Sequence, residues 1–155
     1  MQVRDILARK GHQVYSVPPD CLVREAAAMI AARNIGVAVI VNSQGALLGI
    51  ISERDFLRSL HKIGGNLLKL PVSVLMTGRV ITCTPETDAR DALSLMGSHR
   101  IRHLPVVRDG QILGLISVRD VLKFQLEVRE EQDRDNGRAL PATSPNSYIS
   151  PEGAS

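Results

Sequence analysis

The chain has 155 residues, of which 44% are hydrophobic and only 3% aromatic, so its core must be built from aliphatic side chains. The formal net charge of +3 is mildly basic, and no block of five lysines and arginines occurs, which disfavours nucleic-acid binding. No apolar run reaches the roughly 18 residues that a membrane-spanning helix needs. The amino terminus also has no apolar stretch of signal-peptide length, so we expect a soluble cytoplasmic protein without a membrane partner.

The first half of the chain predicts a β-α-β-β-α unit behind a short helix. The expected elements are a short helix at 3–9, a strand at 13–17, a helix at 22–33, strands at 36–41 and 47–52, and a helix at 53–62. The helix at 22–33 is indicated by apolar residues at helical spacing, and the strand at 36–41 by a continuous β-branched run. We take residues 1–62 as the first repeat.

The second half predicts the same order of elements. Residues 63–79 form a linker that ends in a short helical turn, and residues 80–132 form the second repeat. Its expected elements are a strand at 80–83, a helix at 88–99, strands at 103–107 and 112–117 around an Asp-Gly hairpin turn, and a final helix. Residues 133–155 are rich in charged residues, proline and serine, so we expect a disordered tail.

One motif shows that the two halves are copies. The segment GIISERD at 49–55 returns 65 residues later as GLISVRD at 114–120, with five of seven residues identical. Positions upstream of the motif recur at a spacing of 66, so one residue has been lost in the turn at 42–45. One such unit would leave an apolar face uncovered. The expected fold class is therefore α/β (α+β), with tandem β-α-β-β-α repeats packed about a pseudo-twofold axis and two related clefts at the seam.

Each motif ends in Ser-x-x-Asp, whose side chains could cap the following helix or bind a ligand. Ser52 with Asp55, and Ser117 with Asp120, follow a strand and open a helix, which fits a capping box. They also stand at the carboxyl end of a strand, where open α/β sheets bind ligands. A carboxylate there can accept two hydrogen bonds from a ribose diol, and a helix amino terminus favours phosphate. A serine can cap and contact a ligand together, so both interpretations stay open.

The ordered set of motifs resembles the cystathionine-β-synthase-type (CBS) domain pair, or Bateman module, of the stand-alone bacterial type. The resemblance covers residues 1–130 and rests on Leu75-Met76-Thr77, the segment HLPVV at 103–107 and the two Gly-x-x-Ser-x-Arg-Asp endings. Much of that family binds AMP, ADP, ATP, NAD or S-adenosylmethionine between its repeats. The resemblance implies a regulatory module that is not an enzyme and requires no cofactor. It also implies a homodimer and an unidentified regulated partner protein.

The resemblance further implies roles for individual residues. The ribose diol would be accepted by Asp55 and Asp120, with Ser52 and Ser117 beside them. Ile35 and Ile101 would lie close to the adenine, and Ser16-Val17 and Thr82-Cys83 would present backbone groups to it. Thr77 belongs to the segment that crosses over one pocket.

The basic residues are distributed unequally between the repeats. Arg102 and His103 stand where the family places phosphate-contacting residues, whereas the matching positions in the first repeat are Gly36 and Val37. We therefore expect one cleft that favours an anion and one that holds phosphate weakly.

Other interpretations of these charged residues remain open. Arg102 alternates with an apolar residue as in a solvent-facing row, and His103 could be a surface imidazole. Arg54 and Arg119, directly before each motif aspartate, could add charge to the clefts or face water. The other histidines lack metal-ligand spacing, so neither a metal site nor a catalytic residue is predicted.

The function that we expect is regulation by an adenosine-containing small molecule, AMP, ADP, ATP or NAD, with the ligand state passed to a partner by linkage. One alternative is a ligand-independent dimeric interaction scaffold whose clefts stay empty. Another is a nucleic-acid-associated module that uses the arginine-rich face. The apolar stripes of the helices at 22–33 and 88–99 could form the dimer surface or be consumed by the core.

Overall fold

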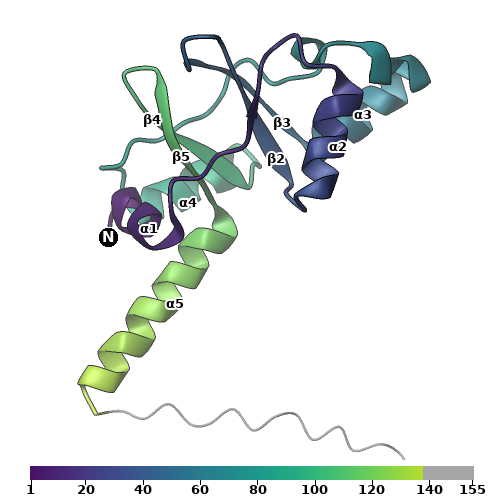
Figure 1. Ribbon diagram of the computed structural model, residues 1–155. Coiled ribbons are helices and arrows are strands. Elements are labelled where there is room, and N and C mark those ends of the chain that lie inside the picture. Colours follow the sequence, from purple (N-terminus) through teal and green to yellow (C-terminus); the bar gives the residue numbers. More distant parts are fainter. Residues whose placement is uncertain (138–155) are drawn as a thin grey trace, which may run out of the picture. The chain divides into compact units, whose positions relative to one another are not determined.

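Helices and strands alternate along the chain in two similar series (Figure 1). The computed structural model describes residues 1–137, which divide into a unit of residues 1–121 and a second unit that starts at Leu122. The first series comprises α1 (Val3–Lys10), β1 (Ser16–Val17), α2 (Val23–Ala32), β2 (Val37–Val41), β3 (Leu47–Ser52) and α3 (Glu53–Ile63). Two 3₁₀ helices, η1 (Gly65–Lys69) and η2 (Val72–Val74), precede α4 (Ala89–Ser98), β4 (His103–Arg108), β5 (Gln111–Ser117) and α5 (Val118–Asp135).

The strands form one small sheet in each repeat. In the first repeat, β2 pairs in parallel with β1 and antiparallel with β3. In the second, β4 and β5 form an antiparallel pair, joined by Asp109 and Gly110 at φ values of 51° and 76°. Two positive φ values in succession are typical of a two-residue hairpin turn. The mixed helix and strand content confirms the expected α+β fold of two repeats.

The prediction of a full strand at residues 80–83 is wrong, because only Cys83 pairs, in an isolated bridge with Val106. In the first repeat, the Val39 N–H donates to the Tyr15 carbonyl over 3.1 Å and thereby extends the pairing of β1 with β2. The residue 66 positions after Val39 is Pro105, which has no N–H to donate. The corresponding bond to Ile81 cannot form, so the backbone before Cys83 stays outside the sheet. In the first repeat itself, β1 is confined to two residues of the strand predicted at 13–17.

Each repeat receives a helical segment from outside its own sheet. The α1 helix packs on the second repeat, where the Val3 and Arg4 N–H groups donate to the Thr87 and Pro85 carbonyls, both over 2.9 Å. Figure 1 shows α1, at the purple end of the chain, beside β5. In return, the linker packs on the first repeat, where the Val72 N–H donates to the Cys21 carbonyl over 2.8 Å. Neither repeat is therefore complete without a segment of the other.

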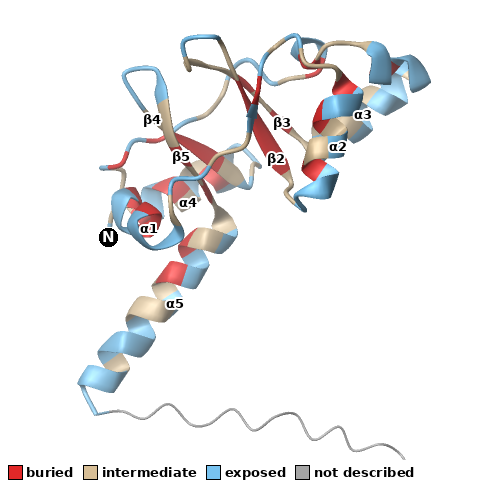
Figure 2. Ribbon diagram, viewed as in Figure 1, coloured by how far each residue is buried: buried red, intermediate tan, exposed pale blue. Residues whose placement is uncertain are grey.

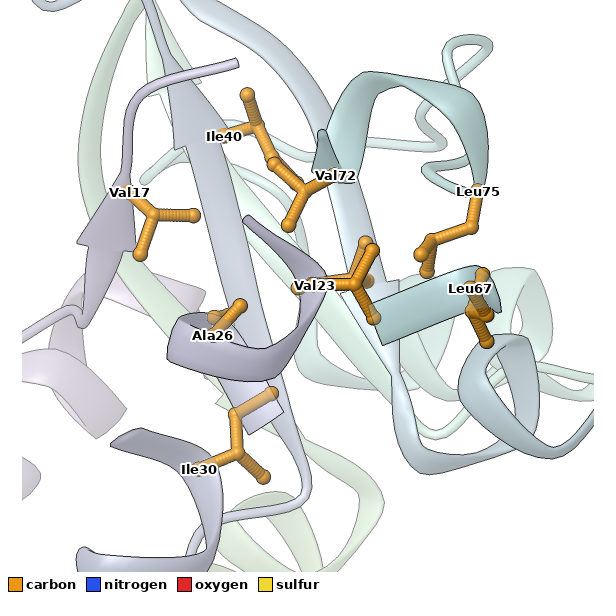
Figure 3. Packing of buried hydrophobic residues seen from close by; sticks show 10 residues of the cluster. Val17, Val23, Ala26, Ile30, Ile40, Leu67, Val72 and Leu75 are labelled. Atoms are coloured by element: carbon orange, nitrogen blue, oxygen red, sulfur yellow. The ribbon is translucent and has the colours of Figure 1, made fainter. Parts of the chain in front are cut away.

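The core is aliphatic, as the scarcity of aromatic residues requires. The cluster in the first repeat (Figure 3) consists of Val17, Val23, Ala26, Ile30, Ala38, Ile40, Ile51, Leu67, Val72 and Leu75. In the second repeat, α4 likewise buries Ala92 and Met96. The apolar stripes of α2 and α4 are thus consumed mainly by the core, and the only large apolar side chains left exposed in the first repeat's helices lie on α3. In Figure 2, α3 carries no buried residue.

The glycine that begins each repeated motif marks a close contact between repeats. A Cβ atom at Gly49 would lie 2.5 Å from Met76 Sδ and 3.1 Å from the Thr77 carbonyl oxygen. A Cβ atom at Gly114 would lie 2.7 Å from Leu7 Cδ2. Met76 belongs to the linker, which packs on the first repeat, and Leu7 belongs to α1, which packs on the second. The absence of a side chain at each glycine therefore allows the crossing segments to approach.

We expect Gly49→Ala to lower the free energy of unfolding by about 1–3 kcal/mol, because the added methyl group overpacks this contact. Urea denaturation of the purified chain measures the change. Gly65→Ala is the matched control, since a Cβ atom there meets no atom within 4 Å. Equal stability of the two variants would contradict the packing role of Gly49.

Candidate ligand-binding clefts

The larger cavity lies at the seam of the two repeats and has a volume of about 870 Å³. We call it the first cleft. It is enclosed by the motif of the first repeat at 52–55 and by residues 77–81 and 99–103 of the second half. Its aliphatic lining residues are Val37, Ile50, Val80, Ile81, Ile101 and Val118. This volume and mixed lining are typical of a site for a small organic molecule.

Asp55 caps a helix and lines the first cleft at the same time. Its Oδ2 atom accepts the Ser52 N–H over 2.8 Å and the Ser52 hydroxyl over 3.1 Å, so the motif forms the expected cap of α3. Within residues 1–137, no group lies within hydrogen-bond distance of Oδ1. The capping role therefore leaves one carboxylate oxygen of Asp55 available to a ligand, and the two interpretations of the motif are compatible.

The first cleft is strongly basic. Six arginines line it: Arg54, Arg58, Arg79, Arg100, Arg102 and Arg119. Its acidic residues are Glu53 and Asp55, which leaves an excess of four positive charges when the histidines are neutral. An enclosed surface with this excess attracts anions.

The second cavity is smaller, at about 330 Å³, and its acidic residue is already paired. We call it the second cleft. Asp120 Oδ2 accepts the Ser117 N–H over 2.8 Å and the Lys10 ammonium over 2.6 Å. Lys10 also donates to the Leu115 carbonyl over 2.6 Å. Partial burial acts to raise the pKa of Asp120, but the hydrogen bond and charge of Lys10 outweigh it and lower this pKa. The carboxylate expected to accept a ribose diol thus forms an ion pair with the chain's own ammonium group at Oδ2, which the Asp55 carboxylate does not.

His103 lies between the two clefts and lines both. Burial and the nearby Lys10 ammonium lower the pKa of His103, so its imidazole is neutral at pH 7. Gly36 leaves room for this arrangement, since a Cβ atom there would lie 3.3 Å from Glu53 Oε1 and 3.9 Å from His103 Cε1. The permanent charge of the first cleft therefore comes from its arginines.

The structure brings most of the predicted site residues to one cleft or the other. The first cleft is lined by Ser52, Arg54, Asp55, Thr77, Ile101, Arg102 and Arg119, the second by Ile35 and Asp120, and both by Ser117 and His103. Val17 is buried in the core and Thr82 is exposed, and neither lines these two cavities. The uneven charge of the two linings agrees with the unequal clefts that the sequence predicts.

Several lining residues escaped the sequence analysis. Arg58 follows Arg54 by four residues on α3, a spacing that places both on one face and could have identified it. Arg79 directly precedes the strand predicted at 80–83, and Arg100 directly follows the helix predicted at 88–99. Neither belongs to a recognised motif. Lys10 gives no local signal either, because it reaches Asp120 only through the packing of α1 on the second repeat.

Residues 1–137 contain no cluster of three or more histidine, cysteine or acidic side chains that could hold a metal ion. No helix in that range has both the length and the apolar character that a bilayer crossing requires.

Known proteins share this architecture. The family model described as "CBS domain" matches residues 3–62 and again 72–127. The chain is 39% identical over 143 residues to "CBS domain-containing protein CBSX3, mitochondrial" of Arabidopsis thaliana, and the match covers 86% of this chain and 69% of that protein.

Two solved structures illustrate the structural similarity. The CBS-domain containing protein ATU1752 from Agrobacterium tumefaciens matches with a TM-score of 0.77 and 37% identity, covering 81% of this chain and 99% of that one. CBS domain protein PAE2072 from Pyrobaculum aerophilum, whose crystal structure is a complex with AMP, matches with a TM-score of 0.71 and 26% identity, covering 84% and 99%. The two matched segments, the repeated motifs and the fold together show that the chain belongs to the CBS domain family, with two CBS repeats in tandem.

Proposed function

We propose that the chain is a regulatory module that binds an adenine nucleotide in the first cleft and passes the ligand state to a partner protein. The observation that carries the proposal is Asp55, which lines an 870 Å³ cleft with one carboxylate oxygen left unpartnered by the helix cap. A carboxylate in that position can accept the hydroxyl groups of a ribose. The AMP bound to PAE2072, which is 26% identical to this chain, supports an adenosine ligand.

The lining of the first cleft offers complementary surfaces to the other parts of a nucleotide. Ile101, Val80 and Ile81 provide apolar area for the base, and Thr77 lies on the same wall. The arginines provide charge for phosphate, with Arg102 among them. AMP, ADP, ATP and NAD share the adenosine phosphate that these surfaces would recognise.

Regulation in this proposal follows from linkage. Both repeats line the first cleft, so a ligand that contacts both favours one arrangement of the repeats over others. A partner protein that prefers the same arrangement is then coupled to the ligand by the same free energy. The nucleotide is a regulatory ligand and takes part in no reaction. A cytoplasmic location is part of the proposal and is consistent with Cys21 and Cys83, which form no disulfide.

Thermal denaturation with AMP, ADP, ATP, NAD and S-adenosylmethionine tests the proposal. A nucleotide present at about 100 times its Kd should stabilise the folded chain by about 2.7 kcal/mol. If none of the five compounds shifts the melting temperature, the ligand-independent scaffold replaces the nucleotide sensor as the better account.

We further propose that two copies of the chain associate through α3. The helix buries none of its residues, and Leu57, Leu60 and Ile63 are 70%, 48% and 41% exposed. Their spacing of three residues places these aliphatic side chains along one side of the helix. Such a surface suits a symmetric contact in which the same patch of each copy meets its counterpart.

The double substitution Leu57→Lys, Leu60→Lys should convert the dimer to a monomer, because two like charges would face their counterparts across the symmetric contact. Light scattering coupled to size-exclusion chromatography gives the mass. Lys62→Gln, at an exposed position on another side of α3, should leave the dimer intact. A dimeric mass for the double variant, or a monomeric mass for the unsubstituted chain, would refute the α3 contact.

A further inference from the structure

We infer that the first cleft selects a nucleoside polyphosphate, with affinity that rises as phosphates are added, and that each chain binds one such molecule. This inference rests on the proposed function, because it assumes that an adenosine compound enters the first cleft. The observations behind it are the charge of the cleft, the lack of counter-charges for its arginines, and the contrast with the second cleft.

The charge of the first cleft exceeds what one phosphate group can neutralise. Its six arginines and two acidic residues leave an excess of four positive charges. A nucleoside monophosphate carries about two negative charges at neutral pH, and a triphosphate carries about four. A triphosphate therefore balances the cleft, whereas a monophosphate leaves about half of the excess uncompensated.

The arginines of the first cleft form no ion pair with an acidic side chain in the part of the chain that the structure describes. None of the six forms an ion pair within residues 1–137, and the one side-chain bond among them runs from Arg54 Nη1 to the Arg100 carbonyl over 3.3 Å. The cations that do form ion pairs in this range, Lys10 with Asp120 and Arg108 with Glu86 among them, lie outside the first cleft. Like charges gathered without counter-ions repel one another, so a bound polyanion would relieve a repulsion that the protein leaves in place.

The arginines converge from segments that are far apart in the sequence. Arg54 and Arg58 lie on α3, Arg79 is the last residue of the linker, Arg100 and Arg102 directly precede β4, and Arg119 lies in the first turn of α5. A solvent-facing row on one helix would not bring these segments to one cavity. Guanidinium groups that approach from several sides match the successive phosphates of a chain, each of which accepts charge-assisted hydrogen bonds.

The second cleft lacks these features. None of the arginines lines it, and its lysine is held by the Asp120 carboxylate and the Leu115 carbonyl. The ammonium of Lys10 and the carboxylate of Asp120 therefore neutralise each other, and the second cleft offers no excess of positive charge to a polyphosphate. One polyphosphate for each chain follows from this difference.

Calorimetric titration of the full chain with adenosine, AMP, ADP and ATP tests the inference. We expect ATP to bind at least tenfold more tightly than AMP, with ADP between them and one ATP bound per chain. The variant Arg79→Gln, Arg102→Gln should reduce the ratio of ATP to AMP affinity at least fivefold while adenosine binding stays unchanged, which also shows that the variant is folded. Arg24→Gln, on an exposed position of α2 outside both clefts, should keep the original ratio.

The outcomes separate the inference from the function on which it rests. Equal affinity for AMP and ATP, two ATP molecules per chain, or an unchanged ratio in the double arginine variant overturns the polyphosphate inference while the nucleotide sensor survives. Failure of adenosine and of all three nucleotides to bind overturns both. Inorganic tripolyphosphate that binds as tightly as ATP also overturns both, since the cleft would then recognise the anion without the nucleoside.

Discussion

Asp55→Ala should weaken the binding of ATP at least 100-fold, whereas Asp120→Ala should leave ATP binding within threefold of the original value. In the proposed complex the ribose diol donates its hydrogen bonds to the Asp55 carboxylate, and a hydrogen bond to a charged group contributes about 1.5–3 kcal/mol. Two such bonds account for about 3 kcal/mol or more, which corresponds to at least a 100-fold change in Kd.

Asp120→Ala is a matched control because both aspartates stand at the same position of a helix cap. Asp55 accepts the Ser52 N–H and Asp120 accepts the Ser117 N–H, each over 2.8 Å. Loss of either cap should cost about 0.5–2 kcal/mol of stability, and Asp120→Ala should lose the ion pair with Lys10 as well, so without ligand it should unfold at the lower temperature of the two. Calorimetric titration then isolates the ligand contact. Equal losses of ATP affinity in both variants would show that the cap, and not the diol contact, explains the effect.

Lys10→Met should open the second cleft, so that the chain binds two molecules of adenosine where the unsubstituted chain binds one. The substitution keeps the aliphatic part of the side chain but removes the ammonium that occupies Asp120 Oδ2 over 2.6 Å. The freed carboxylate can then accept a ribose diol as Asp55 is proposed to do. Adenosine is the suitable probe, because the second cleft without Lys10 would repel phosphate.

The double variant Lys10→Met, Asp120→Ala should return the stoichiometry to one adenosine per chain, since it removes the acceptor along with the ammonium. Calorimetry measures the number of sites directly. A single site in Lys10→Met, in a variant that still unfolds cooperatively, would show that Lys10 does not close the second cleft.

Ion pairing of Lys10 with Asp120 also predicts a pH dependence. The folded pKa of Asp120 lies below its ordinary value, so the pair contributes stability at neutral pH that is lost as the pH falls through this pKa. Lys10→Met should therefore lose less stability than the unsubstituted chain when both are acidified from pH 6 to pH 3. Urea denaturation at both pH values measures the difference, and identical losses would contradict the contribution of the pair.

Repetition made the fold predictable from the sequence. The strand and helix patterns of each half were weak alone, but the motif at 49–55 and its copy at 114–120 fixed the order of elements in both. What failed was the assumption that the copies are equal. Pro105 removes one N–H from β4 and with it most of the strand expected at 80–83, a long-range effect that the sequence of residues 80–83 does not show.

The candidate site was predictable where it depends on the motif and not where it depends on packing. Asp55 and Ser52 stand in a recognisable sequence at the end of a strand, and the structure places both on the first cleft. Arg79 and Lys10 reach the clefts only because the linker and α1 cross between the repeats. The path of these segments between the repeats depends on the burial of apolar faces over the whole unit, so no local sequence pattern predicts it.

The most direct measurement is a crystal structure of the chain grown with saturating ATP. We predict a nucleotide in the first cleft, with both ribose hydroxyl groups within hydrogen-bond distance of the Asp55 carboxylate and the phosphates among the arginines. The Lys10–Asp120 pair should remain closed over the second cleft. A first cleft without nucleotide under these conditions, or a nucleotide that leaves Asp55 uncontacted, would contradict the account.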